Sequence, residues 1–231
     1  MPTSDRLLLA AGVLLLAGCS APSEAPSGAP AGSRAPAEPR PSAQATVGAE
    51  PVEEAALHSD GTPRGAMLTI PSIRVRGLAV VPYVGWTDDA PGTRIQNRGR
   101  AASPHGPRGG VGPGGIGNYQ VTAHRLSSTR AFEQLPSLRR GDVVHVAAGG
   151  VRYTYRIVGT RETSFRLPGS LRAQRAAVPG RPGVTPTRAM ITLSTCATLE
   201  DHAAGNWWAD RFGNPEHRID KIGVLVTSTP V

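Results

Sequence analysis

Beyond residue 66, apolar residues alternate with polar ones or gather in short runs along most of the chain. Alternation with a period of two indicates a half-buried β-strand, and short runs rich in Val, Ile and Leu are typical of buried strands. The predicted strands are several short ones within 67–84, punctuated by Pro71 and Pro82, then 117–124, 143–148, 151–165, 189–196 and 218–226. The pair Gly149-Gly150 between two of these runs predicts a hairpin turn.

The rest of this region reads mostly as loop. Segments 87–115 and 168–188 are rich in Gly and Pro. Ser128 or Thr129 is expected to cap a short helix through Leu135, which Pro136 would end. Many short strands, one short helix and no alternation of strands with helices favour an all-β closed barrel.

The first 19 residues have the pattern of an export signal. Arg6 precedes an apolar run over 7–17 that is too short for an ordinary membrane span. The run ends in Leu-Ala-Gly-Cys and resembles a bacterial lipobox, which implies cleavage before Cys19 and diacylation of its sulfur. The alternative is an uncleaved signal anchor that happens to contain a cysteine. In both cases the rest of the chain is expected outside the cytoplasm.

Residues 20–65 are mainly Ala, Pro, Ser and Gly. Such a segment cannot bury enough apolar surface to offset its chain entropy, so we expect a disordered tether there. The chain's 28 Gly and 22 Pro agree with a linker of this kind. Residues 66–231 are then expected to form one folded domain.

The formal net charge of +8 comes almost entirely from arginine, since Lys221 is the only lysine among 231 residues. The arginines are scattered, and aromatic residues make up 4% of the chain, so no nucleic-acid partner is expected. Two cysteines are too few for a disulfide scaffold or a cysteine-based zinc site. No apolar run approaches the roughly 20 residues of a membrane-spanning helix, which excludes a multi-pass membrane protein.

Two strand-end residues are candidates for chemistry. Cys196 ends a β-branched run, and one unpaired cysteine in an exported domain points either to a reactive thiol or to a buried core residue. His124 ends another predicted strand and would serve a cysteine nucleophile as its proton partner. Taken alone, it is equally a structural histidine.

The other histidines and the arginines carry weaker signals. His145 lies within a predicted strand, whereas His202 and His217 lie near the loop after Cys196. Because no His-x-x-x-His or His-x-His pair occurs, neither a metal nor a cofactor is expected. Arg218 opens the last predicted strand and could donate hydrogen bonds to an oxyanion. Arg211 lies in a Gly-Asn-Pro turn and is the less suitable of the two.

Several motifs, taken in order, resemble the sortase family, and most of all the actinobacterial housekeeping type often called class E. They are the segment 117–125 (GNYQVTAHR), Phe132-Glu133-Gln134-Leu135, Leu138 with Gly141-Asp142, the segment 192–196 (TLSTC), and Arg218 at the start of a terminal strand. The resemblance spans about residues 67–226. The lipobox and the long loop between Cys196 and Arg218 depart from the family pattern.

This resemblance implies an eight-stranded sortase-type barrel with one or two short helices and a cysteine transpeptidase activity. Cys196 would attack the Thr–Gly bond of an LPxTG- or LAxTG-like sorting signal. His124 would act as acid and base, Arg218 would bind the oxyanion, and Thr195 would line the substrate pocket. The partners implied are secreted proteins with such signals and an amine of a peptidoglycan precursor, with a pilin lysine as a lesser alternative.

Two competing functions use the same residues differently. One is a surface lipoprotein barrel that binds a ligand and keeps Cys196 inert. The other is a Cys-His hydrolase that passes the acyl group to water. In all three cases the protein is expected at the outer face of the membrane of a Gram-positive envelope, held by its N-terminal lipid or anchor.

Overall fold

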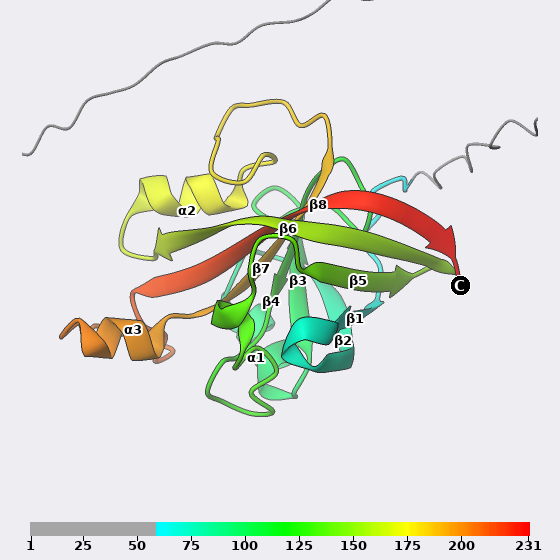
Figure 1. The fold of residues 1–231 in the computed structure, drawn as a ribbon. Helices are drawn as coiled ribbons and strands as arrows, with labels where there is room; N and C mark the ends of the chain where they lie inside the picture. Colours follow the sequence, from blue (N-terminus) through cyan, green and yellow to red (C-terminus); the bar gives the residue numbers. More distant parts are fainter. Residues whose placement is uncertain (1–58) are drawn as a thin grey trace, which may run out of the picture. The chain divides into compact units, whose positions relative to one another are not determined.

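The computed structural model describes residues 59–231, which include eight β-strands. The strands are β1 (Ala66–Ile70), β2 (Val75–Val84), β3 (Ala101–His105), β4 (Gly117–Thr122), β5 (Val143–Ala148), β6 (Val151–Ser164), β7 (Ala189–Cys196) and β8 (His217–Pro230). They form a closed barrel in the order β1-β2-β3-β4-β7-β8-β6-β5, with β5 pairing back to β1 (Figure 1). The prediction of a closed eight-stranded β-barrel is therefore confirmed.

Most neighbouring strands are antiparallel, but β2 pairs in parallel with β3, and β4 in parallel with β7. The expected hairpin between β5 and β6 is present, and both of its glycines, Gly149 and Gly150, have positive φ. A two-residue turn of this kind needs positive φ at both positions, which glycine adopts without steric strain.

The inward-facing side chains of the strands fill the barrel. Alternation is clearest in β5, where every second residue is buried. The largest fully buried apolar side chains are Tyr119, Tyr155, Phe132, Leu68, Ile70, Leu135, Ile157, Ile191 and Leu193. Phe132 and Leu135 come from the connection after β4, so this connection is anchored in the core.

Strand β3 lies within 87–115, which the sequence assigned to a loop. Three short α-helices also lie in segments that were expected to be loops. They are α1 (Ala90–Asn97), α2 (Pro168–Arg175) and α3 (Thr198–Ala203). In α1, the Asp89 side chain caps the helix by accepting a hydrogen bond from the Gly92 backbone at 2.8 Å. A Cβ at Gly92 would lie 2.3 Å from the Tyr83 hydroxyl, so close packing on β2 requires glycine there. Pro91 and Gly92, which suggested a loop, therefore lie in the first turn of α1, where Gly92 permits close packing on β2.

The helix expected over 128–135 is wrong. Residues 131–134 form turns, and a one-turn 3-10 helix, η2, follows at Leu135–Ser137. A second such helix, η1, spans Pro71–Ile73 between β1 and β2. Both start with proline in their first turn, where its missing N–H needs no partner.

The end of the predicted linker packs against the barrel domain. The Ser59 hydroxyl donates to the Pro113 carbonyl at 2.5 Å, and the Gly112 backbone donates to the Gly61 carbonyl at 2.7 Å. The predicted signal segment, Cys19 and the linker up to residue 58 lie outside the described residues. Within 59–231, no helix is long and apolar enough to cross a membrane.

Candidate active site

Cys196 and Arg218 are direct partners across the antiparallel β7/β8 pair. Cys196 is the last residue of β7, and Arg218 is the second residue of β8. Arg218 was expected to open the last strand, and this register places it beside the thiol at one end of the barrel. In Figure 1, α2 and α3 flank the same end of the barrel, where β6 ends and β8 begins.

The guanidinium of Arg218 is fully buried and held on two sides. Its Nε donates to Asp88 Oδ2 at 2.6 Å, and its Nη1 donates to the Pro215 and His217 carbonyls at 2.8 and 3.2 Å. Its carbon Cζ lies 4.0 Å from the centre of the Phe165 ring. The third nitrogen, Nη2, is buried and has no hydrogen-bond partner within the described chain. Nη2 is thus the one guanidinium nitrogen whose hydrogen-bonding capacity is unused within the described residues.

Asp88 is a site residue that the sequence analysis did not identify. It lies between β2 and α1, and its second oxygen accepts a hydrogen bond from Gln96 Nε2 at 2.8 Å. Its backbone has φ of 58°, a left-handed conformation that is uncommon for a residue other than glycine. The sole sequence signal was a pair of acidic residues, Asp88-Asp89, within a segment taken as loop.

His124 follows β4, which pairs in parallel with β7 up to Thr122 and Ser194. The pairing continues one step further, since the Ala123 backbone donates to the Ser194 carbonyl at 3.3 Å. This brings His124 to the same end of the barrel as Cys196. Its Nε2 lies 2.7 Å from Asn97 Oδ1 at the end of α1, which orients the half-buried ring.

Thr195 is almost fully buried at 2% exposure. Its hydroxyl donates to the Ala123 carbonyl at 2.9 Å, so it ties β7 to the residue that precedes His124. Thr195 does not line the large cavity described below. The structure therefore places its hydroxyl on the backbone next to His124; Cys196, His124 and Arg218 do not line that cavity either.

Arg125 provides a second connection that the sequence analysis missed. Its Nη1 donates to the Cys196 carbonyl at 3.3 Å, and its two terminal nitrogens form a forked ion pair with Glu200 in α3. The side chain is buried. Arg125 thus links the residue after His124 to the backbone of Cys196 and to the helix that follows it.

In the resting site, the side chains of Cys196 and His124 are both uncharged. Burial raises the pKa of the Cys196 thiol to about 11; Arg218 opposes this shift and Asp88 adds to it. Burial lowers the pKa of His124, against a smaller upward effect of Asp88. At neutral pH the thiol therefore keeps its proton and the imidazole is uncharged.

The remaining histidines of the described chain, other than His105 at the end of β3, have partners of their own. His145 contacts the Thr154 hydroxyl at 3.1 Å, His202 stacks on Trp207 at 4.0 Å between ring centres, and His217 lies 2.6 Å from Asp201. Among these residues no cluster of three or more His, Cys, Asp or Glu side chains could hold a metal ion.

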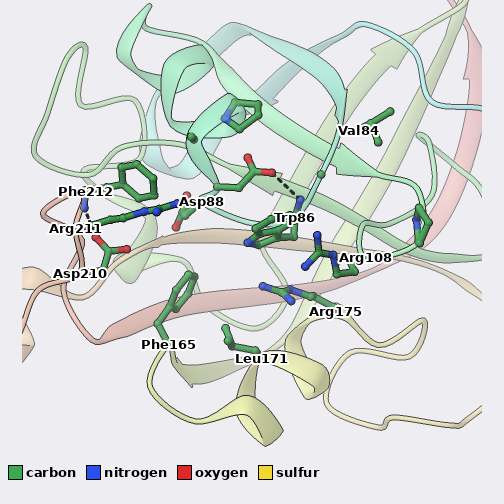
Figure 2. Close-up of a pocket in the computed structure, with 15 residues that line it drawn as sticks. Val84, Trp86, Asp88, Arg108, Phe165, Leu171, Arg175, Asp210, Arg211 and Phe212 are labelled. Carbon is green, nitrogen blue, oxygen red and sulfur yellow. Dashed lines mark hydrogen bonds between the residues drawn. The ribbon is translucent and has the colours of Figure 1, made fainter.

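A cavity of about 520 Å³ adjoins the Asp88–Arg218 pair (Figure 2). Its lining residues are Val84, Gly85, Trp86, Asp88, Asp89, Ala90, Pro91, Pro107, Arg108, Phe165, Leu171, Arg175, Asp210, Arg211 and Phe212. Arg211 lies there with its guanidinium 4.7 Å from the Phe212 ring centre. It belongs to the loop before β8 and forms no contact comparable to those that fix Arg218.

The fold matches that of known proteins. SrtA sortase from Actinomyces oris has a TM-score of 0.54 at 16% identity, over 76% of this chain and 87% of that one. Sortase E1 from Streptomyces coelicolor, solved with a tripeptide in the active site, gives 0.54 at 20% identity, over 75% and 94%. A comparison with curated protein sequences gave no match. A family model for the sortase domain matches residues 68–210, which is more than half of the chain, and the chain therefore belongs to the sortase family.

Proposed function

We propose that the protein is a cysteine transpeptidase of the class E type that cleaves an LPxTG- or LAxTG-like sorting signal between Thr and Gly. It joins the new carboxyl end to an amine of a peptidoglycan precursor. The observation that carries this proposal is the pairing of Cys196 with Arg218 across β7 and β8, with His124 on the neighbouring parallel strand end.

In the first half-reaction, the proton of the Cys196 thiol passes to His124, and the thiolate attacks the carbonyl carbon of Thr. The carbonyl oxygen, which becomes negatively charged, accepts a hydrogen bond from Arg218 Nη2, the buried donor without a partner. When the tetrahedral intermediate collapses, the C–N bond breaks and His124 returns the proton to the leaving glycine amine. The product is a thioester on Cys196.

In the second half-reaction, an incoming amine attacks the thioester carbon. His124 accepts the proton that the amine loses, Arg218 again stabilises the oxyanion, and the C–S bond breaks. The thiolate of Cys196 leaves and regains its proton from His124, so the enzyme returns to the neutral resting pair. A covalent intermediate of this kind predicts ping-pong kinetics.

The cavity beside Arg218 is a suitable place for the sorting signal. Apolar side chains from four connections between strands contribute to its lining, and its volume lies in the usual range for ligand sites. The solved sortase E1 from Streptomyces coelicolor holds a tripeptide in its active site. A short peptide in the cavity of this chain agrees with that arrangement.

We further propose the organisation of the whole chain: residues 1–19 as a lipoprotein-type signal, 20–65 as a linker and 66–231 as the catalytic domain. Lipidation at Cys19 would hold the enzyme at the outer face of the membrane. A flexible tether raises the effective concentration of substrates held at the same surface. Intact-mass measurement of the protein extracted from membranes tests this: an uncleaved, unmodified N-terminus would contradict lipidation.

A panel of LPxTG and LAxTG peptides, incubated with and without triglycine and followed by mass spectrometry, tests the reaction. We expect cleavage after Thr and a ligated product when triglycine is present. Hydrolysis alone, unchanged by triglycine, would indicate a Cys-His hydrolase. Absence of both products, together with a thiol that resists a methanethiosulfonate reagent in the folded protein, would favour the ligand-binding lipoprotein.

The variant Cys196→Ala serves as the control for the panel. Loss of an activated nucleophile costs on the order of a million-fold in rate in other enzymes. The residual rate of such a variant should therefore lie far below about 1% of the wild-type rate. Cleavage above that level would exclude a covalent role for Cys196.

A further inference from the structure

A cluster of two arginines and one tryptophan occupies the end of the cavity away from Arg211 and Phe212. The guanidinium carbon of Arg108 lies 3.7 Å from the centre of the Trp86 ring, and that of Arg175 lies 6.0 Å from it. Figure 2 shows both arginine side chains beside the indole. The three residues come from different segments: the β2–α1 connection, the β3–β4 connection and the end of α2.

The backbone of Trp86 is fixed by two hydrogen bonds to neighbouring side chains. The Trp86 carbonyl accepts a hydrogen bond from the Tyr83 hydroxyl at 2.6 Å, and the Trp86 N–H donates to Asp89 Oδ2 at 3.1 Å. Gly85 is required beside it, because a Cβ there would lie 2.2 Å from the same Asp89 oxygen. The main chain that carries the indole is therefore fixed in position.

The two positive charges have no partner of opposite sign in direct contact. Neither Arg108 nor Arg175 forms an ion pair within 4.0 Å among residues 59–231. Asp89 is the acid whose charge acts on Arg175, but its oxygens already accept hydrogen bonds from Trp86 and Gly92.

Arg175 is the better placed of the two to bind a ligand. Its Nε is buried and has no hydrogen-bond partner in the described chain. Burial and, next, the charge of Arg108 lower the pKa of Arg175. A buried cationic donor without a partner is unfavourable, and two adjacent guanidiniums repel each other. An anion between them would remove both penalties.

The substrate half that reaches this cluster follows from the proposed function. The amine that leaves must depart toward His124, which protonates it. The cavity is lined by Asp88 and Phe165, the two side chains that contact the Arg218 guanidinium, and has no lining residue from the connection that carries His124. The half that stays attached to Cys196, N-terminal to the scissile bond, therefore occupies the cavity.

We propose that Arg108 and Arg175 bind the carboxylate of an acidic residue in the sorting signal, N-terminal to its Thr–Gly bond. Guanidiniums pair with carboxylates through two parallel hydrogen bonds, which gives such a site geometric selectivity. The enzyme would thus select an acidic residue at one position of its peptide substrate in addition to the Thr and Gly that flank the cleaved bond.

The test uses the full chain and peptides in which Glu replaces Gln at each position on either side of the Thr–Gly bond. At one position N-terminal to the bond, Glu should raise kcat/KM by about tenfold or more over Gln, in line with a charge-assisted hydrogen bond. Arg175→Gln and Arg108→Gln should each reduce this preference. Arg175→Glu should reverse it in favour of a Lys-containing peptide.

Arg172→Gln is the matched control, because Arg172 lies on the same helix, is exposed and does not line the cavity. It should keep the full preference for Glu. Equal rates for every Glu and Gln pair, a preference only on the glycine side, or a preference that survives both Gln variants would each overturn the proposal. These outcomes differ from failure of the proposed function, in which no peptide is cleaved at all.

Discussion

Asp88 and Arg218 lie 130 positions apart in the sequence and form a buried ion pair, with 2.6 Å between Asp88 Oδ2 and Arg218 Nε. The pair has two effects. It fixes the guanidinium so that Nη2 is left as the available donor. It also places a negative charge close enough to Cys196 to disfavour the thiolate.

Replacing Asp88 with Asn keeps the size of the side chain and removes its charge. The pKa of Cys196 should fall, because Asp88 then ceases to oppose the thiolate and Arg218 is no longer neutralised. Alkylation by iodoacetamide at pH 8 should become about three- to tenfold faster, since its rate follows the thiolate fraction. The pH dependence of alkylation measures this directly.

Asp60→Asn is the control for that experiment, because Asp60 pairs with Arg64 at the surface. Its alkylation profile should match that of the wild type. An unchanged midpoint in Asp88→Asn would mean that the Asp88 charge does not reach the thiol.

Arg218→Ala should lower kcat/KM by about 10²–10³-fold, the usual cost of losing one oxyanion donor. It should also reduce the free energy of unfolding by about 3–5 kcal/mol, because Asp88 is left buried without its partner. The double variant Asp88→Ala/Arg218→Ala should recover part of the stability and none of the activity. Urea denaturation and peptide cleavage measure the two quantities separately.

Two further arginine variants provide the comparison for the activity lost in Arg218→Ala. Arg218→Lys should recover only part of the activity, since an ammonium lacks the fork of donors. Arg211→Ala should remain within about tenfold of the wild type, the effect expected of a contact outside the oxyanion site. If Arg211→Ala were the more damaging of the two alanine variants, the oxyanion role would belong to Arg211.

The pH profile of kcat/KM should be broad. The reactive thiolate–imidazolium form is a constant minor fraction between the pKa values of His124 and Cys196, and it decreases outside them. Activity should therefore fall on the acid side below the ordinary histidine value and on the alkaline side near pH 11. A profile that peaks sharply near pH 7 would contradict the burial of either group.

His124→Ala should reduce kcat by about 10²–10⁴-fold, the range for loss of a general acid and base. His145→Ala changes a histidine that faces Thr154 on the barrel wall and should leave the rate close to that of the wild type. The opposite ranking would transfer the proton-transfer role away from His124.

Arg125 should act as a positioning residue. Arg125→Ala removes its contacts to the Cys196 carbonyl and Glu200, so kcat should fall by about tenfold or more while KM changes little, as expected when a geometry is loosened. Arg125→Lys should restore part of kcat. Arg130→Ala, which breaks an exposed pair with Glu133, should leave kcat unchanged.

Every strand except β3, together with Cys196 and Arg218 at the strand ends, could be predicted because their signal is local; β3 lies within 87–115, where Gly and Pro conceal a five-residue strand. Alternation marked β5, the glycine pair marked its hairpin to β6, and the apolar run after Arg218 marked β8. The placement of Arg218 opposite Cys196 required only that the last two strands pair, and they do.

The residues that support the site could not be predicted in this way. Asp88 meets Arg218 only after the barrel closes, and Arg125 contacts Cys196 through a pairing of β4 with β7 that no local pattern encodes. The helix α1 was missed for a related reason. Its residues are Gly- and Pro-rich, and packing against Tyr83 stabilises them rather than intrinsic helix propensity.

The loop between Cys196 and Arg218 leaves and rejoins the barrel at adjacent positions, where the Ala197 backbone donates to the His217 carbonyl at 2.9 Å. Asp201 closes the base of the loop by accepting a hydrogen bond from the His217 N–H at 2.9 Å. Beyond these two hydrogen bonds, the tip of the loop at 204–214 contributes Asp210, Arg211 and Phe212 to the lining of the cavity. Doubling the length of a flexible loop costs only about 0.6 kcal/mol. The tip can therefore be exchanged for one of another length or sequence, so that in evolution or engineering a new peptide preference can be grafted onto an unchanged nucleophile.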